Sequence, residues 1–153
     1  MKLDSNLVKE NKLILESYHY GKIAYDKSEL IKFEKGLLGF EDLKKFIIRE
    51  IEENKSFRLL HSVEDSKIAF VVINPFEFKD SYEIDIEEEV IERLNIQNES
   101  DVMLFNTVTL HNDPSKITTN LRAPIVINVL NKKAEQVILK TEEFKIKHSL
   151  MEA

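Results

Sequence analysis

The chain has 153 residues, a length that predicts one domain able to bury roughly 68–70% of the surface of its unfolded chain. It is 42% hydrophobic and 33% charged, with three Gly and three Pro, which excludes a disordered or low-complexity protein. The net charge of −6 disfavours direct nucleic-acid binding, and the absence of Cys excludes disulfides, thiolate metal sites and Cys nucleophiles.

The sequence predicts a cytoplasmic protein without a membrane segment. The N-terminal residues carry charges every few positions, so they do not resemble a secretory signal. The longest uncharged apolar run, residues 68–76, is far shorter than the ~20 residues of a membrane-spanning helix. We expect a single domain over residues 1–153, in which the first dozen polar residues form a loose extension.

Most of the chain is expected to form short strands with turns about every 8–12 residues, which is typical of an antiparallel β-barrel or sandwich. Residues 81–86 and 143–149 alternate between polar and apolar side chains. Residues 68–74 and 125–131 do not alternate, so we expect them to be central strands covered on both faces. In chain order the expected strands are residues 13–20, 22–26, 29–33, 46–51, 57–63, 68–74, 81–86, 102–110, 125–131, 136–140 and 143–149.

Turns are indicated by Gly, Pro and short polar residues. Residues 64–67 and 131–135 are expected to be hairpin connections, and residues 111–116 a loop. Gly36 and Gly39 permit positive φ and predict a sharp bend that tucks Leu37 and Leu38 inward. The same two Gly match the Gly-x-x-Gly of a KH nucleic-acid clamp, but the strand-like flanks and the Leu-Leu centre favour the turn.

One short α-helix is expected around residues 86–95. Asp85 is placed to cap it, with Glu88 three residues later as in a capping box. The expected buried stripe consists of Ile86, Val90, Ile91 and Leu94. A one-turn helix at residues 40–46 is a second candidate.

Negative charge is concentrated around this helix. The segment from Asp80 to Asp101 contains nine acids and one base, so it carries −8 and the rest of the chain +2. This segment is either a solvated helix start or also a surface that repels RNA and attracts a basic partner, and the two interpretations are compatible. The residues that we assign to an acidic RNA-repelling patch are Glu83, Asp85, Glu87, Glu88 and Glu89.

No pattern of catalytic or metal-binding residues is present. The four His lie in four separate segments without zinc-ligand spacing, so we expect neither a metal nor a cofactor. No Gly-x-Ser-x-Gly motif occurs, and no carboxylate lies in a clearly apolar context. The chain is therefore not expected to be an enzyme.

Two polar corners adjoin the most apolar strands. Asn74-Pro75-Phe76 follows residues 68–74, where Pro75 ends the strand and Asn74 can satisfy backbone groups. The alternative is functional, with Phe76 and Phe78 presenting an aromatic edge. Thr118-Thr119-Asn120 precedes Leu121, Arg122 and Pro124, and Pro124 belongs at a sheet edge or bulge because it has no N–H. Polar corners on rigid strands are good positions for binding.

Taken together, several segments resemble the FliW family of bacterial flagellar assembly factors. The Phe-x-x-Gly-x-x-Gly-Phe-Glu run of residues 33–41 is similar to the opening of the family. Residues 69–86, 101–110, 118–139 and 144–150 complete the resemblance in the expected order, which leaves residues 1–17 as an N-terminal extension ahead of a core at about 18–150. Leu38 stands where the family often has Pro, so this turn is expected to differ slightly.

The resemblance implies a compact β-rich protein without catalysis that binds two partners in turn, flagellin and the RNA-binding translational regulator CsrA. In this family CsrA represses flagellin translation, and FliW released from flagellin binds CsrA away from its RNA surface. We expect a monomer when free, without direct nucleic-acid binding. A small β-barrel nucleic-acid-binding protein is the alternative. The candidate partner-binding residues are Asn74, Pro75, Phe76, Phe78, Thr119, Asn120, Leu121, Arg122 and Pro124.

Overall fold

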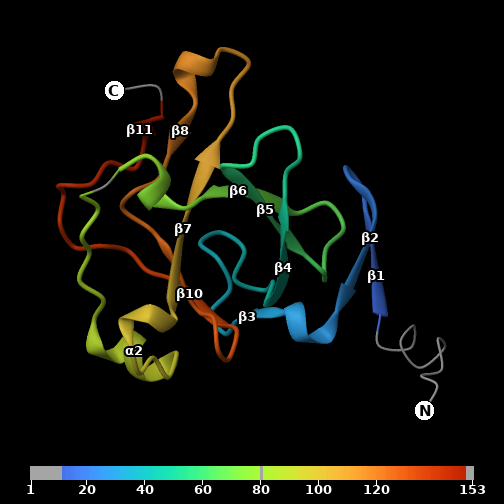
Figure 1. Cartoon of the computed structure of the whole chain (residues 1–153), viewed down its shortest axis with the longest axis horizontal. Helices are drawn as coiled ribbons and strands as arrows, with labels where there is room; N and C mark the ends of the chain where they lie inside the picture. The colour runs from blue at the N-terminus through green and yellow to red at the C-terminus, as the bar shows by residue number, and fades with distance from the viewer. Residues whose placement is uncertain (1–11, 80, 151–153) are drawn as a thin grey trace.

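The computed structural model describes residues 12–79 and 81–150, and its central feature is a closed β-barrel of seven strands (Figure 1). Around the barrel the order is β7–β6–β5–β4–β3–β10–β9, and β9 pairs back onto β7. The prediction of a mainly β barrel or sandwich with one short helix is confirmed, and the structure is the barrel. The barrel strands are β3 (Ile31–Phe33), β4 (Lys45–Glu50), β5 (Phe57–Ser62), β6 (Ala69–Ile73), β7 (Val102–Thr109), β9 (Ile125–Asn128) and β10 (Lys133–Gln136).

One barrel pairing departs from the expected antiparallel arrangement. β10 runs parallel to β3, with Lys133 opposite Lys32 and Ala134 opposite Phe33. The other neighbours in the barrel are antiparallel. The parallel pair arises where the last strand of the barrel meets the first, a contact between segments about one hundred residues apart that no local turn constrains.

The strands bury two apolar layers because successive side chains point to opposite faces. Phe105 and Ile125 point into the barrel, whereas their neighbours Leu104 and Val126 point outward under helix α2 (Glu88–Arg93). The outer layer therefore gives the helix an apolar surface to cover. The outer cluster contains Tyr82, Val90, Leu94, Leu104, Leu121, Val126, Leu139 and Phe144.

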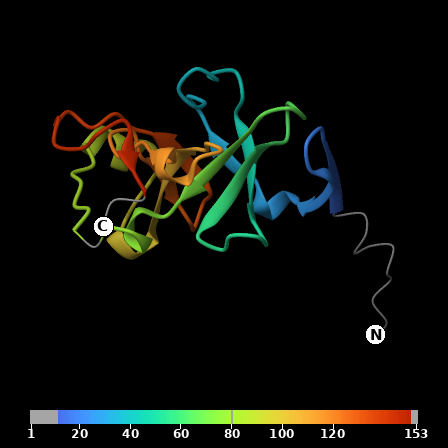
Figure 2. The same cartoon turned by 90° about the horizontal axis from the view of Figure 1, so that it is seen from above.

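A two-stranded hairpin, β1 (Lys12–Ser17) and β2 (Gly21–Asp26), lies at the end of the molecule far from α2 (Figures 1 and 2). Leu15 and Tyr25 pack on Ile47 of the barrel. Ser17 Oγ lies 2.7 Å from His61 Nε2, and His61 Nδ1 lies 2.7 Å from the Ser62 carbonyl oxygen. Residues 12–17 of the expected N-terminal extension thus form β1, and residues 1–11 lie outside the described residues.

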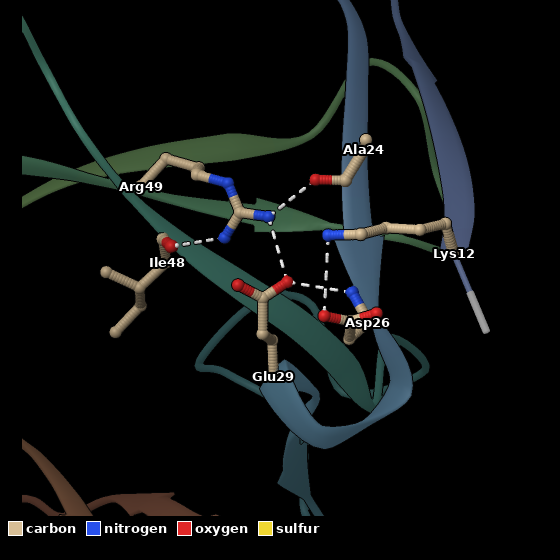
Figure 3. A network of polar contacts seen from close by, with 6 residues as sticks. All are labelled: Lys12, Ala24, Asp26, Glu29, Ile48 and Arg49. Atoms are coloured by element: carbon tan, nitrogen blue, oxygen red, sulfur yellow. Dashed lines mark hydrogen bonds and ion pairs between the residues drawn. The ribbon is translucent and has the colours of Figure 1, made fainter. Parts of the chain in front are cut away.

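An ionic network also ties this hairpin to the barrel (Figure 3). Arg49 Nη2 donates to Glu29 Oε2 (3.0 Å) and to the Ala24 carbonyl (2.7 Å), and the Asp26 N–H donates to Glu29 Oε2 (2.8 Å). Lys12 lies 3.5 Å from Asp26. Partial burial by itself raises the pKa of Glu29, but the hydrogen bonds from Asp26 and Arg49 outweigh it and the pKa is lowered.

Two short strands extend the sheet beyond β7. β8 (Thr118–Thr119) pairs with β7, and β11 (His148–Ser149) pairs with β8 (Figure 1). Short 3₁₀ turns occur at η1 (Lys27–Glu29), η2 (Pro75–Glu77), η3 (Glu99–Asp101) and η4 (Pro114–Lys116). Among residues 12–79 and 81–150, no helix is long and apolar enough to cross a membrane.

The expected strands at 22–26, 46–51, 57–63, 68–74 and 102–110 are observed to within one residue at each end. The strand expected at 81–86 is wrong, because this segment is extended but pairs with no strand among the described residues. The strand expected at 143–149 is reduced to β11.

The strand expected at 136–140 is wrong apart from Gln136, because β10 covers Lys133–Gln136 and so occupies most of the turn expected at 131–135. The Lys132 N–H donates to the Asn128 carbonyl (2.8 Å), and Lys132 has a φ of 63°, so the chain reverses before β10 begins.

Three local expectations about helices and turns are also corrected. Glu87, not Asp85, is the N-cap of α2, and its side chain makes no capping hydrogen bond. Residues 40–46 contain turns and the start of β4, not a helix. At the 36–40 bend Leu37 is buried, but Leu38 is 49% exposed, so only one of the two leucines turns inward.

Candidate protein-binding site

The first polar corner is built by Asn74, directly after β6. Its Oδ1 accepts a hydrogen bond from the Phe76 N–H (2.9 Å), which starts the η2 turn. Pro75 is buried and occupies the first position of this turn, which the fixed φ of its ring favours. Phe76 is 49% exposed, and the half-buried Phe78 stacks on His148 at 5.9 Å. The corner therefore turns the chain and leaves one aromatic ring on the surface.

The second corner is built by Thr119 and Asn120. Thr119 is buried and donates its hydroxyl to the Thr107 carbonyl (2.9 Å). Asn120 Oδ1 accepts from the N–H groups of Arg122 (3.0 Å) and Ala123 (3.1 Å), as short polar side chains do at turns. The corner is therefore held by its own side chains and faces largely inward.

Three further residues complete this corner. Leu121 and Pro124 are buried, and the half-buried Arg122 donates through Nε to the Phe144 carbonyl (2.9 Å). These contacts bind the corner to the chain around residue 144.

Tyr82 joins the two corners. Its ring meets Phe76 edge-on at 6.3 Å, and its hydroxyl donates to the Leu121 carbonyl (2.5 Å). The buried Asn106 donates through Nδ2 to the Asn120 carbonyl (2.8 Å) and, at 3.4 Å, to the Tyr82 hydroxyl. Two stretches about forty residues apart in the sequence are thus fixed side by side through one phenol.

Tyr82 and Asn106 are not among the candidate residues predicted from the sequence. Tyr82 falls in the strand predicted at residues 81–86, and Asn106 is one polar residue in the apolar run 102–110. The sequence still indicates a structural role for both residues, because a Tyr or Asn in a buried run needs a hydrogen-bond partner and often bridges distant backbone.

The nine candidate partner-binding residues differ in their accessibility. Pro75, Thr119, Leu121 and Pro124 are buried. Asn74, Phe78, Asn120 and Arg122 are half-buried, and Phe76 is exposed. A partner at this face would therefore touch Phe76 first, while the buried residues set the shape of the backbone beneath it.

The acidic patch lies on the segment that leads into α2. Glu83, Asp85, Glu87, Glu88 and Glu89 are all exposed. Lys140 Nζ lies 3.0 Å from Glu87 Oε1, and this contact raises the pKa of Lys140. The carboxylates are thus available to an approaching charged molecule.

The last turn of α2 is attached to the barrel by a two-pronged ion pair. Arg93 Nε and Nη2 reach the two Glu135 oxygens at 2.9 and 2.8 Å. The hydrogen bond to Glu135 raises the pKa of Arg93 further. The helix therefore holds the acidic segment in a fixed place over the outer layer.

Neither a metal-binding cluster nor an accessible Ser–His pair is found among the described residues. Within the part of the chain that the structure describes, no group of three or more His, Asp or Glu could hold a metal ion. The Ser17–His61 pair places a hydroxyl on an imidazole, but both side chains are buried, at 8% and 1% exposure. This pair fastens the hairpin to the barrel and does not face a substrate cavity.

A family model, curated relatives and a solved structure all identify the same family. The sequence model of the family described as FliW protein matches residues 14–150. A protein of Clostridium botulinum (strain Okra / Type B1), named flagellar assembly factor FliW, is 47% identical over 136 residues, covering 89% of this chain and 95% of the relative. A protein of the same name from Clostridium novyi (strain NT) is 49% identical over 136 residues, with the same coverage.

A solved structure agrees with this. The crystal structure of the flagellar assembly factor FliW superimposes with a TM-score of 0.86 at 35% identity, covering 92% of this chain and 99% of that chain.

Proposed function

The chain belongs to the FliW family, and from this we propose that it is a flagellar assembly factor that binds two proteins in turn, flagellin and the translational regulator CsrA. The observation that carries the proposal is the family match over residues 14–150. Family membership also confirms that the chain is not an enzyme, since FliW proteins are non-catalytic assembly factors.

In the proposed cycle the protein acts in the cytoplasm by stoichiometric binding. While flagellin is abundant it occupies the protein, and CsrA represses flagellin mRNA. Once flagellin is exported, the freed protein binds CsrA, CsrA releases the mRNA, and flagellin is translated again. Such a switch requires stoichiometric protein binding and no turnover, which agrees with a rigid barrel whose polar corners are fixed by buried hydrogen bonds.

The acidic patch has a defined part in this proposal. Its five exposed carboxylates repel RNA phosphates across a Debye length of ~8–10 Å at physiological salt. The protein can therefore disfavour RNA on a bound CsrA without occupying the RNA-binding surface itself. The same charge counts against the alternative of direct RNA binding, which needs a basic surface.

The face around the two corners is proposed as a partner-binding surface. Phe76 would make direct contact because it is the exposed member of the set. Asn74 and Asn120 would act by holding the backbone of the two corners. Phe76→Ala removes this contact and the edge-on packing on Tyr82 but keeps those hydrogen bonds, so a folded variant with weaker binding indicates a binding role.

Titration calorimetry tests the proposal. The free protein, expected to be monomeric by light scattering, is titrated into purified CsrA and, separately, into flagellin from the same source. We expect saturable binding to each, and we expect bound flagellin to abolish binding to CsrA. Phe76→Ala should weaken binding to at least one partner by about tenfold, since exposed aromatic anchors commonly contribute more than 1 kcal/mol.

Exposed Tyr18 provides a matched control, because Tyr18→Ala removes an aromatic ring at the far hairpin. A folded protein that binds neither partner would refute the proposal. Retention of RNA by this protein alone in a low-salt filter assay would instead favour the nucleic-acid alternative.

A further inference from the structure

A groove of about 610 Å³ lies beside α2. The acidic segment, residues 83–87, forms one wall, residues 135–141 form the other, and Lys35 and Leu38 also line the groove. Leu38 and Ile138 are 49% and 62% exposed, so the groove carries apolar side chains that are open to solvent. Residues 83–87 and residues 135–139 are extended and the second wall bends at Lys140, so the backbone groups of these walls are as accessible as their side chains.

The wall after β10 is an unpaired strand edge. The N–H groups of Val137 and Leu139 donate to the carbonyls of Pro124 (3.0 Å) and Arg122 (2.8 Å), which continues the antiparallel register of β10 with β9. In an extended chain the next residues point their backbone groups the opposite way. The N–H and C=O of Ile138, and the N–H of Lys140 where the chain begins to bend, therefore face the side on which β10 pairs with β3.

β3 ends too early to cover this edge. It pairs with β10 only at Lys133 and Ala134. Beyond that point the Leu38 N–H donates to the Gln136 side chain (3.0 Å). Within residues 12–79 and 81–150, no hydrogen bond engages the backbone groups of Ile138 or Lys140. A partner strand placed here would find an open row of donors and acceptors.

The opposite wall has the pattern of a strand but no pairing. Ile84 and Ile86 pack into the outer cluster, while Glu83, Asp85 and Glu87 are exposed, so the expected alternation of residues 81–86 is present. This alternation gives the groove a wall whose exposed side chains, those of Glu83, Asp85 and Glu87, are all acidic.

The charges of the groove favour a basic occupant. Its lining contains five acids and three bases. Two ion pairs, Lys140–Glu87 and Arg93–Glu135, use four of these charges. The remaining acids, Glu83, Asp85 and Glu143, have no ion-pair partner among the described residues, and they face one remaining base, Lys35. The unpaired charge of the groove is therefore negative.

We propose that this groove binds an extended segment of another protein by β-strand addition to the Ile138–Lys140 edge, and that basic and apolar residues alternate in this segment. The backbone of the segment hydrogen-bonds with Ile138 and Lys140. Its apolar side chains cover Leu38 and Ile138, and its Lys or Arg side chains reach Glu83, Asp85 and Glu143. The inference does not depend on which protein supplies the segment.

The probe is the capped heptapeptide KVKVKVK, titrated into the ¹⁵N-labelled full-length protein. Saturable binding is expected, with the Ile138 and Lys140 amides showing the largest shifts and new protection from hydrogen exchange. The acidic heptapeptide EVEVEVE is expected not to bind, because its charges would face unpaired carboxylates.

Two N-methylated versions of the probe separate strand addition from simple charge attraction. One carries N-methyl groups on the valines and the other on the lysines, so each blocks the N–H groups of one strand edge. Only one edge of the peptide can face Ile138 and Lys140. One methylated peptide should therefore bind about tenfold more weakly than KVKVKVK, and the other about equally well.

Charge reversal tests the acidic wall. The double variant Glu83→Lys/Asp85→Lys is expected to bind KVKVKVK about tenfold more weakly, and this loss should shrink with added salt. Glu52→Lys is the control, because Glu52 is exposed and does not line the groove. Its affinity should stay within about twofold, and circular dichroism checks that both variants are folded.

Equal binding of both methylated peptides would overturn the proposal, since the attraction would then be ionic only. No binding of KVKVKVK by the folded protein would overturn it too. Shifts at Ile138 that follow protein concentration instead of peptide would assign the edge to a second copy of the chain. The peptide titrations test strand addition at the groove, and the CsrA and flagellin titrations test the partner switch. Either proposal can therefore fail while the other stands.

Discussion

Replacing Tyr82 by Phe tests whether one buried hydroxyl holds the two corners together. The Tyr82 side chain is 2% exposed, and its hydroxyl donates to the carbonyl of Leu121, which is 1% exposed. Water cannot easily replace the lost partner at such a depth, so removal of the hydroxyl leaves a buried carbonyl unsatisfied, at a cost of about 1–3 kcal/mol. The ring contact with Phe144, at 4.9 Å between centroids, remains in the variant.

The assay is urea unfolding of the wild type, Tyr82→Phe and Tyr18→Phe. Tyr18 is 70% exposed, so its hydroxyl should contribute less than about 0.5 kcal/mol. For a chain of 153 residues, each kcal/mol lost at Tyr82 should lower the Tm by about 2–4 °C. Equal unfolding free energies for Tyr82→Phe and Tyr18→Phe would refute the reasoning.

The pH dependence of the unfolding free energy is a second test of the Tyr82 hydroxyl. Burial raises the pKa of Tyr82 above its ordinary value of 10.0, against a smaller opposing effect of the hydrogen bond from Asn106. Because the folded-state pKa exceeds the unfolded one, the stabilisation is complete below pH 10.0 and is lost as the pH rises through the folded-state pKa. The unfolding free energy of the wild type should therefore fall more steeply above pH 10.0 than that of Tyr82→Phe.

Three further predictions concern other parts of the fold. Gly36→Ala should cost about 3 kcal/mol in urea unfolding, because φ is +67° and a Cβ would lie 2.6 Å from backbone; Gly39→Ala, at φ +84° in open space, should cost about 1–2 kcal/mol. Ser17→Ala should cost about 1–2 kcal/mol and speed amide exchange in the β1–β2 hairpin, and unchanged exchange would count against its anchoring role. The contacts that lower the pKa of Glu29 stabilise the folded protein only while the carboxylate is ionised, so this stabilisation is lost as the pH falls from 4.5 through the folded-state pKa. Glu29→Gln should therefore lose less stability than the wild type over this range, and an acid titration identical to that of the wild type would contradict this.

Local periodicity predicted the barrel strands well where the neighbouring strand is also close in the sequence. Strands β4, β5 and β6 follow one another and pair in that order, so short turns and alternation are enough to place them. The prediction that the strands at 68–74 and 125–131 are covered on both faces holds for the four residues of β9, which are all buried, but in β6 only Val72 and Ile73 are buried.

Residues 81–86 show where periodicity was insufficient. The alternation is real, because Ile84 and Ile86 point inward and Glu83 and Asp85 outward. A strand also requires a hydrogen-bonded neighbour, and whether one is available depends on the rest of the fold. Because this segment has no strand neighbour, it remains unpaired and lines the groove beside α2.

The sequence alone determined the class of the fold, the acidic character of the α2 region and the two polar corners, because each follows from residues within a few positions of one another. The tertiary structure alone decided that β10 runs parallel to β3, that Tyr82 links Phe76 to Leu121, and that the edge at Ile138 stays open. These features depend on contacts between distant segments, whose pairing is set by how the barrel closes and not by any local pattern of side chains.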